Sequence, residues 1–172
     1  MNFFITGLPR SRTAWMANFF TTQGNFCFHE GIDGCESLED YSEKLKSDDY
    51  VNIGDSNTYY PYINMGHNDP IVVILRDKAE VNASLKVIFG EHNYMPVLEE
   101  TESRLLKLDA LFVKFGDVNN QLEAIWNHCI KDYKFDAKRA FELSKMRVQT
   151  MHFNFNQNTM NKFKEVLPCL SQ

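Results

Sequence analysis

Short apolar runs alternate with stretches of helical periodicity in the first half of the chain. The runs typical of β-strands are residues 2–6, 25–29, 50–54 and 71–75, and helical spacing covers 13–22, 37–46 and 77–88. The run at 71–75, Ile-Val-Val-Ile-Leu, is wholly apolar, as expected of a central parallel strand buried on both faces. The alternation predicts an α/β fold of three layers, a parallel sheet with helices on both faces.

The second half of the chain is predicted to be mainly helical. Helices are expected at 97–115, 118–133 and 137–145, followed by a strand at 147–153 and a helix at 159–167, while 58–65 is irregular or helical. The helix at 118–133 carries a core-facing stripe at steps of three and four residues, made of Val118, Leu122, Ile125, Trp126, Cys129, Ile130 and Tyr133. We expect one domain, 1–172, with a helical insertion at about 91–146.

The composition of the chain limits the kinds of molecule that it is expected to bind. The chain has 172 residues, 44% hydrophobic and 24% charged, with a net charge of -5. An acidic domain is not expected to bind nucleic acid or anionic membranes broadly, so an anion site must be built locally. The apolar run at the N-terminus is too short for a signal peptide or a membrane span, which favours a cytoplasmic protein.

The cysteines and histidines give no pattern of metal ligands. Close paired spacing is missing among Cys27, Cys35, Cys129 and Cys169, and no two histidines lie one helical turn apart. We expect reduced thiols and no metal.

The loop Gly7-Leu8-Pro9-Arg10-Ser11-Arg12-Thr13 joins the first predicted strand to the first predicted helix. Backbone N–H groups and the helix dipole converge at such a turn and favour an anion. The loop lacks the lysine and second glycine of the common nucleoside-triphosphate loop, and no acidic residue ends the run 71–75 as a magnesium anchor would. The alternative is an ordinary turn with surface arginines.

The segment Pro9-Arg10-Ser11-Arg12-Thr13-Ala14-Trp15 resembles the phosphate loop of the sulfotransferase family, Pro-Lys/Arg-Ser-Gly-Thr-Thr-Trp. The resemblance implies a fold like that of the P-loop nucleoside-triphosphate hydrolases, of sulfotransferase type. It also implies that Arg10, Ser11 and Thr13 bind the 5′-phosphosulfate of the donor, 3′-phosphoadenosine 5′-phosphosulfate, without a metal. Trp15 either stacks on the adenine, as in some relatives, or is a core aromatic.

A second motif matches the same family. Its members bind the 3′-phosphate of the donor with an arginine at the end of a central strand and a serine eight residues later. Arg76 and Ser84 have this spacing and placement. The pair suits a phosphate, because arginine offers a bidentate fork and a hydroxyl adds a hydrogen bond.

Sulfuryl transfer needs a base for the acceptor proton and a cation for the departing phosphate. Arg10 is the expected cation. One subset of the family places a glutamate just after the second strand, where this chain has His29-Glu30. Glu30 is the first candidate for the base and His29 the second, although the two could equally be a polar pair at a strand end. Other relatives place the base after the third strand, which makes Asp55 the third candidate.

Two departures from the family change the loop. Arg12 replaces a glycine, which crowds the anion and adds charge, and Ala14 replaces a threonine, which removes a hydroxyl. The later glycine-containing basic segment of the family is not evident either. An acceptor, a small molecule or peptide with a hydroxyl or amine, could contact Phe28, Tyr59, Tyr60 and Tyr62. The sequence therefore predicts a sulfotransferase, with an ATP- or GTP-dependent phosphotransferase and a non-catalytic nucleotide-binding module as alternatives.

Overall fold

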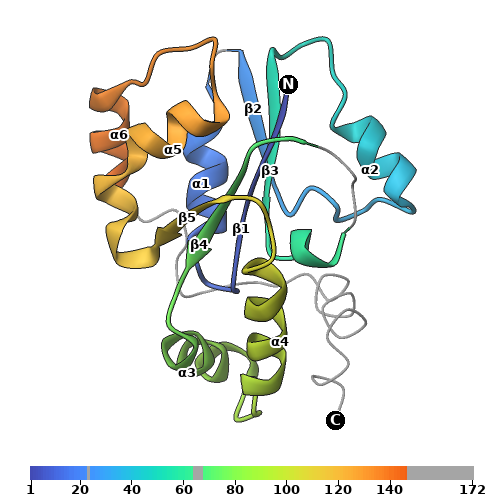
Figure 1. Ribbon diagram of the computed structural model, residues 1–172, viewed down its shortest axis with the longest axis vertical. Helices are drawn as coiled ribbons and strands as arrows, with labels where there is room; N and C mark the ends of the chain where they lie inside the picture. Colours follow the sequence, from blue (N-terminus) through green and yellow to red (C-terminus); the bar gives the residue numbers. More distant parts are fainter. Residues whose placement is uncertain (23, 64–67, 147–172) are drawn as a thin grey trace.

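Five parallel strands form the sheet at the centre of the molecule, in the order β2-β3-β1-β4-β5 (Figure 1). The computed structural model describes residues 1–22, 24–63 and 68–146. The strands are β1 Asn2–Gly7, β2 Asn25–His29, β3 Asn52–Asn57, β4 Ile71–Leu75 and β5 Leu111–Lys114. The helices are α1 Thr13–Phe20, α2 Leu38–Lys44, α3 Lys78–Phe89, α4 Met95–Leu105, α5 Leu122–Cys129 and α6 Ala137–Ser144, with 3₁₀ turns η1 Tyr60–Tyr62 and η2 Phe115–Asn120.

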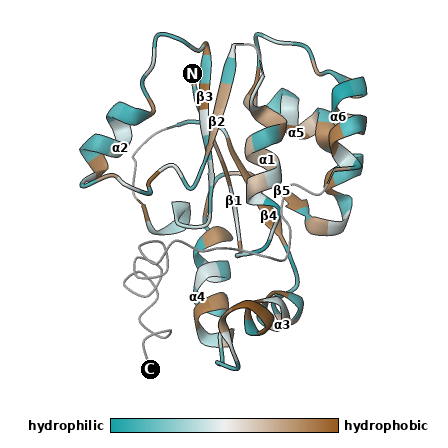
Figure 2. Ribbon diagram, turned by 180° about the vertical axis from the view of Figure 1, so that it is seen from behind, coloured by the Kyte–Doolittle hydropathy of each residue, from teal (hydrophilic) through white to brown (hydrophobic). Residues whose placement is uncertain are grey.

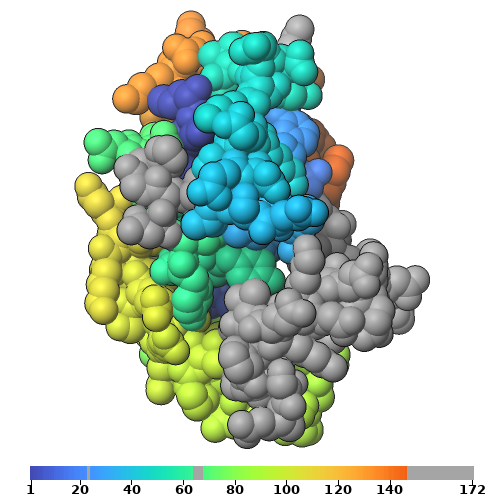
Figure 3. Space-filling view, turned by 90° about the vertical axis from the view of Figure 1, so that its right-hand side faces the viewer, coloured from blue at the N-terminus to red at the C-terminus, as the bar shows by residue number. Residues whose placement is uncertain are grey.

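Two hydrophobic cores lie on opposite faces of the sheet, which confirms the three-layer α/β prediction. One core packs α1, α5 and α6 against the sheet, and there Trp126 stacks on Phe20 with ring centroids 5.6 Å apart. The other core packs α2, α3, α4 and η1 against the opposite face, around Phe4 and Tyr41. Figure 2 shows β4 and β5 as hydrophobic, and Figure 3 looks onto the second layer, with α2 in cyan above α4 in yellow-green.

Local sequence signals place several boundaries correctly. Strand β2 begins and ends where the sequence predicted, and α3 begins after Asp77, whose carboxylate accepts a hydrogen bond from the Glu80 N–H. The Glu80 carboxylate pairs with Arg76. Five predicted core residues near α5, from Leu122 to Ile130, and Val118 are buried, whereas Tyr133 is 37% exposed and does not belong to the stripe.

The helix predicted at 97–115 is wrong at its C-terminal end. Helix α4 stops at Leu105, and Leu111–Lys114 form β5, which pairs in parallel with β4. The run Leu-Phe-Val-Lys is short and partly β-branched, so pairing with the open edge of β4 decides its structure, a contact that periodicity does not reveal. The segment 91–146, expected as a helical insertion, therefore supplies a strand of the sheet. The strand predicted at 147–153 and the helix at 159–167 lie outside the described residues.

Helix α6 fastens the C-terminal end of α1. The guanidinium of Arg139 donates to the carbonyl oxygens of Phe19, Asn18 and Thr21 at 2.6, 2.7 and 2.8 Å. These are carbonyls that the end of a helix leaves without intrahelical partners, and a cation there also complements the helix dipole. Near the other end of α1, the Trp15 Nε1–H donates to the Leu143 carbonyl at 3.1 Å. Two long-range contacts thus fix α1, whose N-terminus carries the predicted phosphate loop.

Candidate functional site

The carboxyl ends of β1 and β4 lie side by side, with Gly7 of β1 level with Ile74 of β4. The chain leaves β1 into α1 on one face and leaves β4 into α3 on the other, so the two connections diverge at the kind of switch point where open α/β sheets hold ligands in a crevice. A Cβ atom at Gly7 would lie 2.6 Å from the Ile74 carbonyl oxygen, so only glycine allows this close approach. The two predicted phosphate motifs therefore meet at one edge of the sheet.

The loop before α1 leaves the N-terminus of the helix without a side-chain cap in the described part of the chain. Arg10 and Arg12 have φ angles of 66° and 67°, in the left-handed region, and no side chain caps the N-terminus of α1 within the described residues. Pro9 is half-buried, and Ala14 is buried as the second residue of α1. The first N–H groups of α1 are then available to an anion.

Unpaired buried polar atoms collect at this edge. In the described part of the chain, buried side-chain atoms without a hydrogen-bond partner are Thr6 Oγ1, Ser11 Oγ, Glu30 Oε2 and Asn52 Oδ1. The first three belong to the ends of β1 and β2 and to the loop between β1 and α1. Because folded proteins leave few such groups, a cluster of them is typical of a place where a ligand supplies the missing partners. The hydroxyls of Thr6 and Ser11 can donate to a phosphate, whereas Glu30 Oε2 can accept from a different group of a ligand.

Arg10 contacts both Ser84 and Arg76, whereas the sequence assigned Arg76 and Ser84 to one phosphate and Arg10 to another. Arg10 Nε donates to Ser84 Oγ at 3.3 Å, and Arg76 Nη1 donates to the Arg10 carbonyl oxygen. Arg76 also pairs with Glu80 at 3.3 Å. Burial and the neighbouring charge of Arg76 lower the pKa of Arg10, as expected for two guanidinium groups that share one crevice. The crevice favours an anion that both can contact.

Arg12 makes contacts that the sequence did not indicate. Its Nη1 donates to Asn119 Oδ1 of η2 at 2.8 Å, and its guanidinium lies 4.4 Å from the centre of the Trp15 ring. Phe115, at the start of η2, lies under Arg76 at 4.3 Å. Sequence reasoning missed η2 because it placed Phe115 at the end of a helix.

Trp15 lies in the core rather than on an open surface. It is 5% exposed and stacks on Phe19 with ring centroids 5.4 Å apart. Of the two interpretations of this residue, the structure supports the core aromatic.

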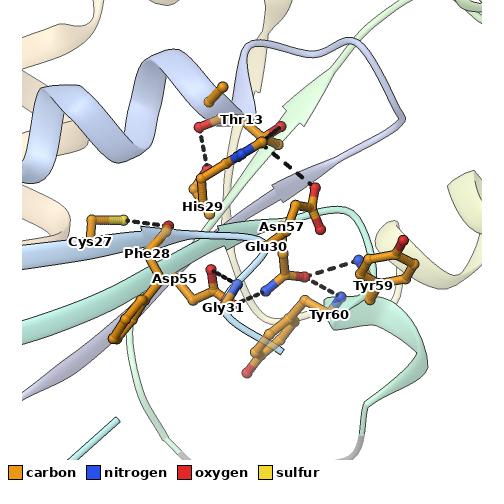
Figure 4. A network of polar contacts seen from close by, with 12 residues as sticks. Thr13, Cys27, Phe28, His29, Glu30, Gly31, Asp55, Asn57, Tyr59 and Tyr60 are labelled. Atoms are coloured by element: carbon orange, nitrogen blue, oxygen red, sulfur yellow. Dashed lines mark hydrogen bonds and ion pairs between the residues drawn. The ribbon is translucent and has the colours of Figure 1, made fainter. Parts of the chain in front are cut away.

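The predicted base lies beside the loop, at the end of β2. Glu30 has a φ of 55°, and His29 Nε2 lies 3.8 Å from Glu30 Oε1 and 3.4 Å from Thr13 Oγ1. Figure 4 shows His29 between Thr13 and Glu30. Burial, together with the charges of Asp55 and Asp33, raises the pKa of Glu30 to about 8, while burial lowers the pKa of His29. The two are therefore mainly uncharged near pH 7, and Glu30 has a pKa suited to proton transfer.

Asp55, the third candidate for the base, is enclosed. It is 0% exposed and accepts hydrogen bonds from the Gly31 N–H, the Tyr41 hydroxyl and the Asn57 amide at 2.9, 2.6 and 2.8 Å. Three donors and full burial leave this carboxylate in a structural position, so a role as the base does not fit.

The four aromatic residues predicted to contact the acceptor do not form one cluster. Tyr60 is buried against Phe4, Tyr62 donates or accepts a hydrogen bond with Thr101 at 2.6 Å, and Phe28 packs under Lys44. Tyr59 is the one that faces the predicted base, since Glu30 and Asp33 contribute, after burial, to raising the pKa of its hydroxyl.

Within residues 1–22, 24–63 and 68–146, no three His, Cys, Asp or Glu side chains gather as a metal site requires. The same part of the chain holds no helix with the length and apolar character needed to span a bilayer.

The left-handed backbone at Arg12 predicts that glycine stabilises the chain more than alanine at this position, the reverse of the usual order in a helix. Arg12→Gly should be more stable than Arg12→Ala by about 1 kcal/mol, because both lose the side-chain contacts and only alanine keeps the backbone strain. Urea denaturation measures the difference. At Lys138, exposed on α6, the order should be the reverse, since alanine is the better helix former. Equal stability of the two Arg12 variants would contradict the assigned conformation.

The buried Glu30 carboxyl predicts a pH-dependent stability. Its pKa in the folded chain, about 8, is above the ordinary 4.5, so the native state holds the proton more tightly and loses stability as pH rises through this interval. Glu30→Gln should not show this loss. Its free energy of unfolding should therefore rise relative to that of the wild type by on the order of 3 to 4 kcal/mol between pH 5 and pH 9. Urea denaturation at several pH values measures it, with Glu39→Gln on the exposed side of α2 as the control. Parallel curves for wild type and Glu30→Gln would mean that Glu30 is not buried in its acid form.

Comparison with known proteins shows a likeness in fold to solved structures. No protein-family model matches the chain, and no curated protein matches its sequence. Among solved structures, the mouse sulfotransferase SULT7A1 complexed with PAP superposes with a TM-score of 0.60, covering 99% of this chain and 84% of that chain at 11% sequence identity. The chain therefore has a fold similar to that of a sulfotransferase.

Proposed function

We propose that this chain is a small sulfotransferase that moves a sulfuryl group from 3′-phosphoadenosine 5′-phosphosulfate to a hydroxyl or amine. The observation that carries the proposal is the hydrogen bond between Arg10 and Ser84, at 3.3 Å. It joins the two motifs that the sequence assigns to the two phosphate positions of the donor, although 74 residues separate them. The likeness to a sulfotransferase complexed with PAP supports the same ligand class.

The residues at the β1 and β4 ends fit the phosphate groups of this donor. The α1 N-terminus, Ser11 and Arg10 would hold the 5′-phosphosulfate, and Arg76 with Ser84 would hold the 3′-phosphate. Burial around Arg10 strengthens its interaction with an anion, since little water screens the charge. Neither role requires a metal.

The chemistry divides between two sides of the site. The donor supplies a sulfuryl group whose bond to phosphate breaks as its bond to the acceptor atom forms. Arg10 keeps its charge at any working pH and would stabilise the phosphate that departs. The ionised form of Glu30, a minor fraction at pH 7 that grows as pH rises toward a pKa of about 8, would take the proton of the acceptor, and the neighbouring His29 is the alternative base.

The acceptor belongs to the same proposal. A small molecule or peptide would enter beside Tyr59, the aromatic next to Glu30. We also propose a cytoplasmic location, because Cys27, Cys35 and Cys129 are free thiols and extracellular proteins more often pair them. Nucleic acid and membranes are not among the proposed partners, given the net charge of -5.

The donor assignment predicts binding without magnesium. 3′-Phosphoadenosine 5′-phosphate at 100 times its Kd should stabilise the chain by about 2.7 kcal/mol, and ATP with magnesium should do less. Arg76→Ala should weaken the binding of the bisphosphate by about 1.5 to 3 kcal/mol and leave the binding of adenosine 5′-phosphate nearly unchanged. Thermal unfolding and calorimetric titration measure these effects.

Arg104→Ala is the matched control, because Arg104 is an exposed arginine paired with Glu100 on α4. If millimolar bisphosphate does not shift the melting temperature, the donor assignment is wrong. A larger shift with ATP and magnesium would favour the phosphotransferase instead.

The base assignment predicts a separation of binding from turnover. Glu30→Gln keeps the shape of the side chain but accepts no proton, so donor affinity should persist while turnover falls by about 10² to 10⁴. Hydrolysis of the donor in the absence of an acceptor is the assay, since water can replace the acceptor. Full activity in Glu30→Gln with loss in His29→Ala would move the base to His29. Bisphosphate binding without any turnover in the wild type would leave a non-catalytic binding module.

A further inference from the structure

Gly31, the residue that follows Glu30, is held through both its N–H and its carbonyl oxygen. The Gly31 N–H donates to Asp55 Oδ1 at 2.9 Å, and the Gly31 carbonyl accepts from Lys44 Nζ of α2 at 2.5 Å. A Cβ atom at Gly31 would lie 2.8 Å from the Cβ of Phe28 and 3.0 Å from Asp55 Cγ. Strand β3 and helix α2 therefore clamp Gly31 through the two peptide groups on either side of it, and any side chain at Gly31 would displace the residue from this position.

Asp55, one arm of this clamp, is itself fixed. Tyr41 and Asn57 donate to its Oδ2, and the Asn57 side-chain oxygen accepts the N–H groups of Tyr59 and Tyr60 at 2.9 and 2.7 Å (Figure 4). This network joins α2, β3 and η1 in the core. Because every donor in it already has a defined partner, Asp55 has little freedom to move away from Gly31.

Glu30 needs such a support. Its φ of 55° is unfavourable for a residue with a side chain, and a conformation of this kind persists only where the neighbouring structure holds it. The Glu30 N–H donates to the Ser56 carbonyl at 3.2 Å, so the peptides on both sides of Glu30 are bound to the region of β3. The groups that face Glu30 are His29 from β2, Asp33 from the next turn, Asp55 from β3, and Thr58 and Tyr59 after β3.

We propose that Asp55 and Lys44 are positioning residues for Glu30. By holding Gly31 they keep the Glu30 carboxyl beside His29, which itself contacts Thr13 at the start of α1, and they connect α2 to the reaction. This inference rests on the proposed function, in which Glu30 is the base. It assigns Asp55 a part in the reaction that requires no contact with the acceptor.

Lys44→Met tests the inference with little disturbance of packing, since the methionine keeps the apolar stem that lies near the Phe28 ring. We expect unchanged affinity for 3′-phosphoadenosine 5′-phosphate and a fall in kcat of about 10²-fold, the effect of misplacing a reacting group by about 1 Å. Lys44→Arg should recover part of the loss. Lys46→Met is the matched control, because Lys46 pairs with Glu43 on the exposed side of α2.

Two measurements on the folded chain separate positioning from general destabilisation. In Lys44→Met the Gly31 amide should exchange with solvent faster, and the carboxyl titration of Glu30, followed by NMR, should move toward the ordinary range as the loop admits water. Tyr41→Phe, which removes one donor from Asp55, should move both readouts in the same direction by less. Tyr41→Phe also tests the inference if the Lys44 variant does not fold.

A fall in kcat together with both changes supports the inference. Unchanged turnover, or lost turnover with unchanged Gly31 exchange and Glu30 titration, overturns it. If the wild type has no turnover, the proposed function fails, and the Gly31 and Glu30 measurements still decide whether Asp55 and Lys44 position Glu30.

Discussion

The parallel pairing of β1 with β4 determines where every other part of the candidate site can lie. Gly7 lets the strands approach closely at their carboxyl ends, and the connections then leave on opposite faces. One connection starts with the loop that carries Arg10, and the other starts with Arg76. A single contact between neighbouring strands thus brings together two segments that lie far apart in the sequence, and it directs the N-terminus of α1 into the same crevice.

Positive and negative side chains occupy different strands at this edge of the sheet. Arg10, Arg12 and Arg76 gather over the ends of β1 and β4, whereas Glu30 and Asp55 lie at β2 and β3. Each group lies near like charges in a poorly hydrated place, so the pKa of Arg10 is lowered and the pKa of Glu30 is raised. A positive side suits a departing phosphate, and a carboxyl that releases its proton reluctantly suits proton transfer.

Prediction from the sequence succeeded where the signal was local or matched a known motif. The run at Ile71–Leu75 and the cap at Asp77 each lie within a few residues, and the structure places them as expected. Strand β5 was missed because its pairing partner lies about 40 residues away. The clamp around Gly31 was missed for the same reason, since Lys44 and Asp55 become its partners only after α2 and β3 have packed.

The fastening of α1 by α6 has a consequence for shortening the chain. Every residue assigned to the anion site or to proton transfer lies before Gln121. A chain cut after η2 would nevertheless lose Arg139, which covers the carbonyls at the end of α1, and Leu143, which accepts from Trp15. It would also expose the stacked face of Phe20 once covered by Trp126. The smallest unit that keeps α1 in place therefore extends through α6, well beyond the last residue that a ligand would touch.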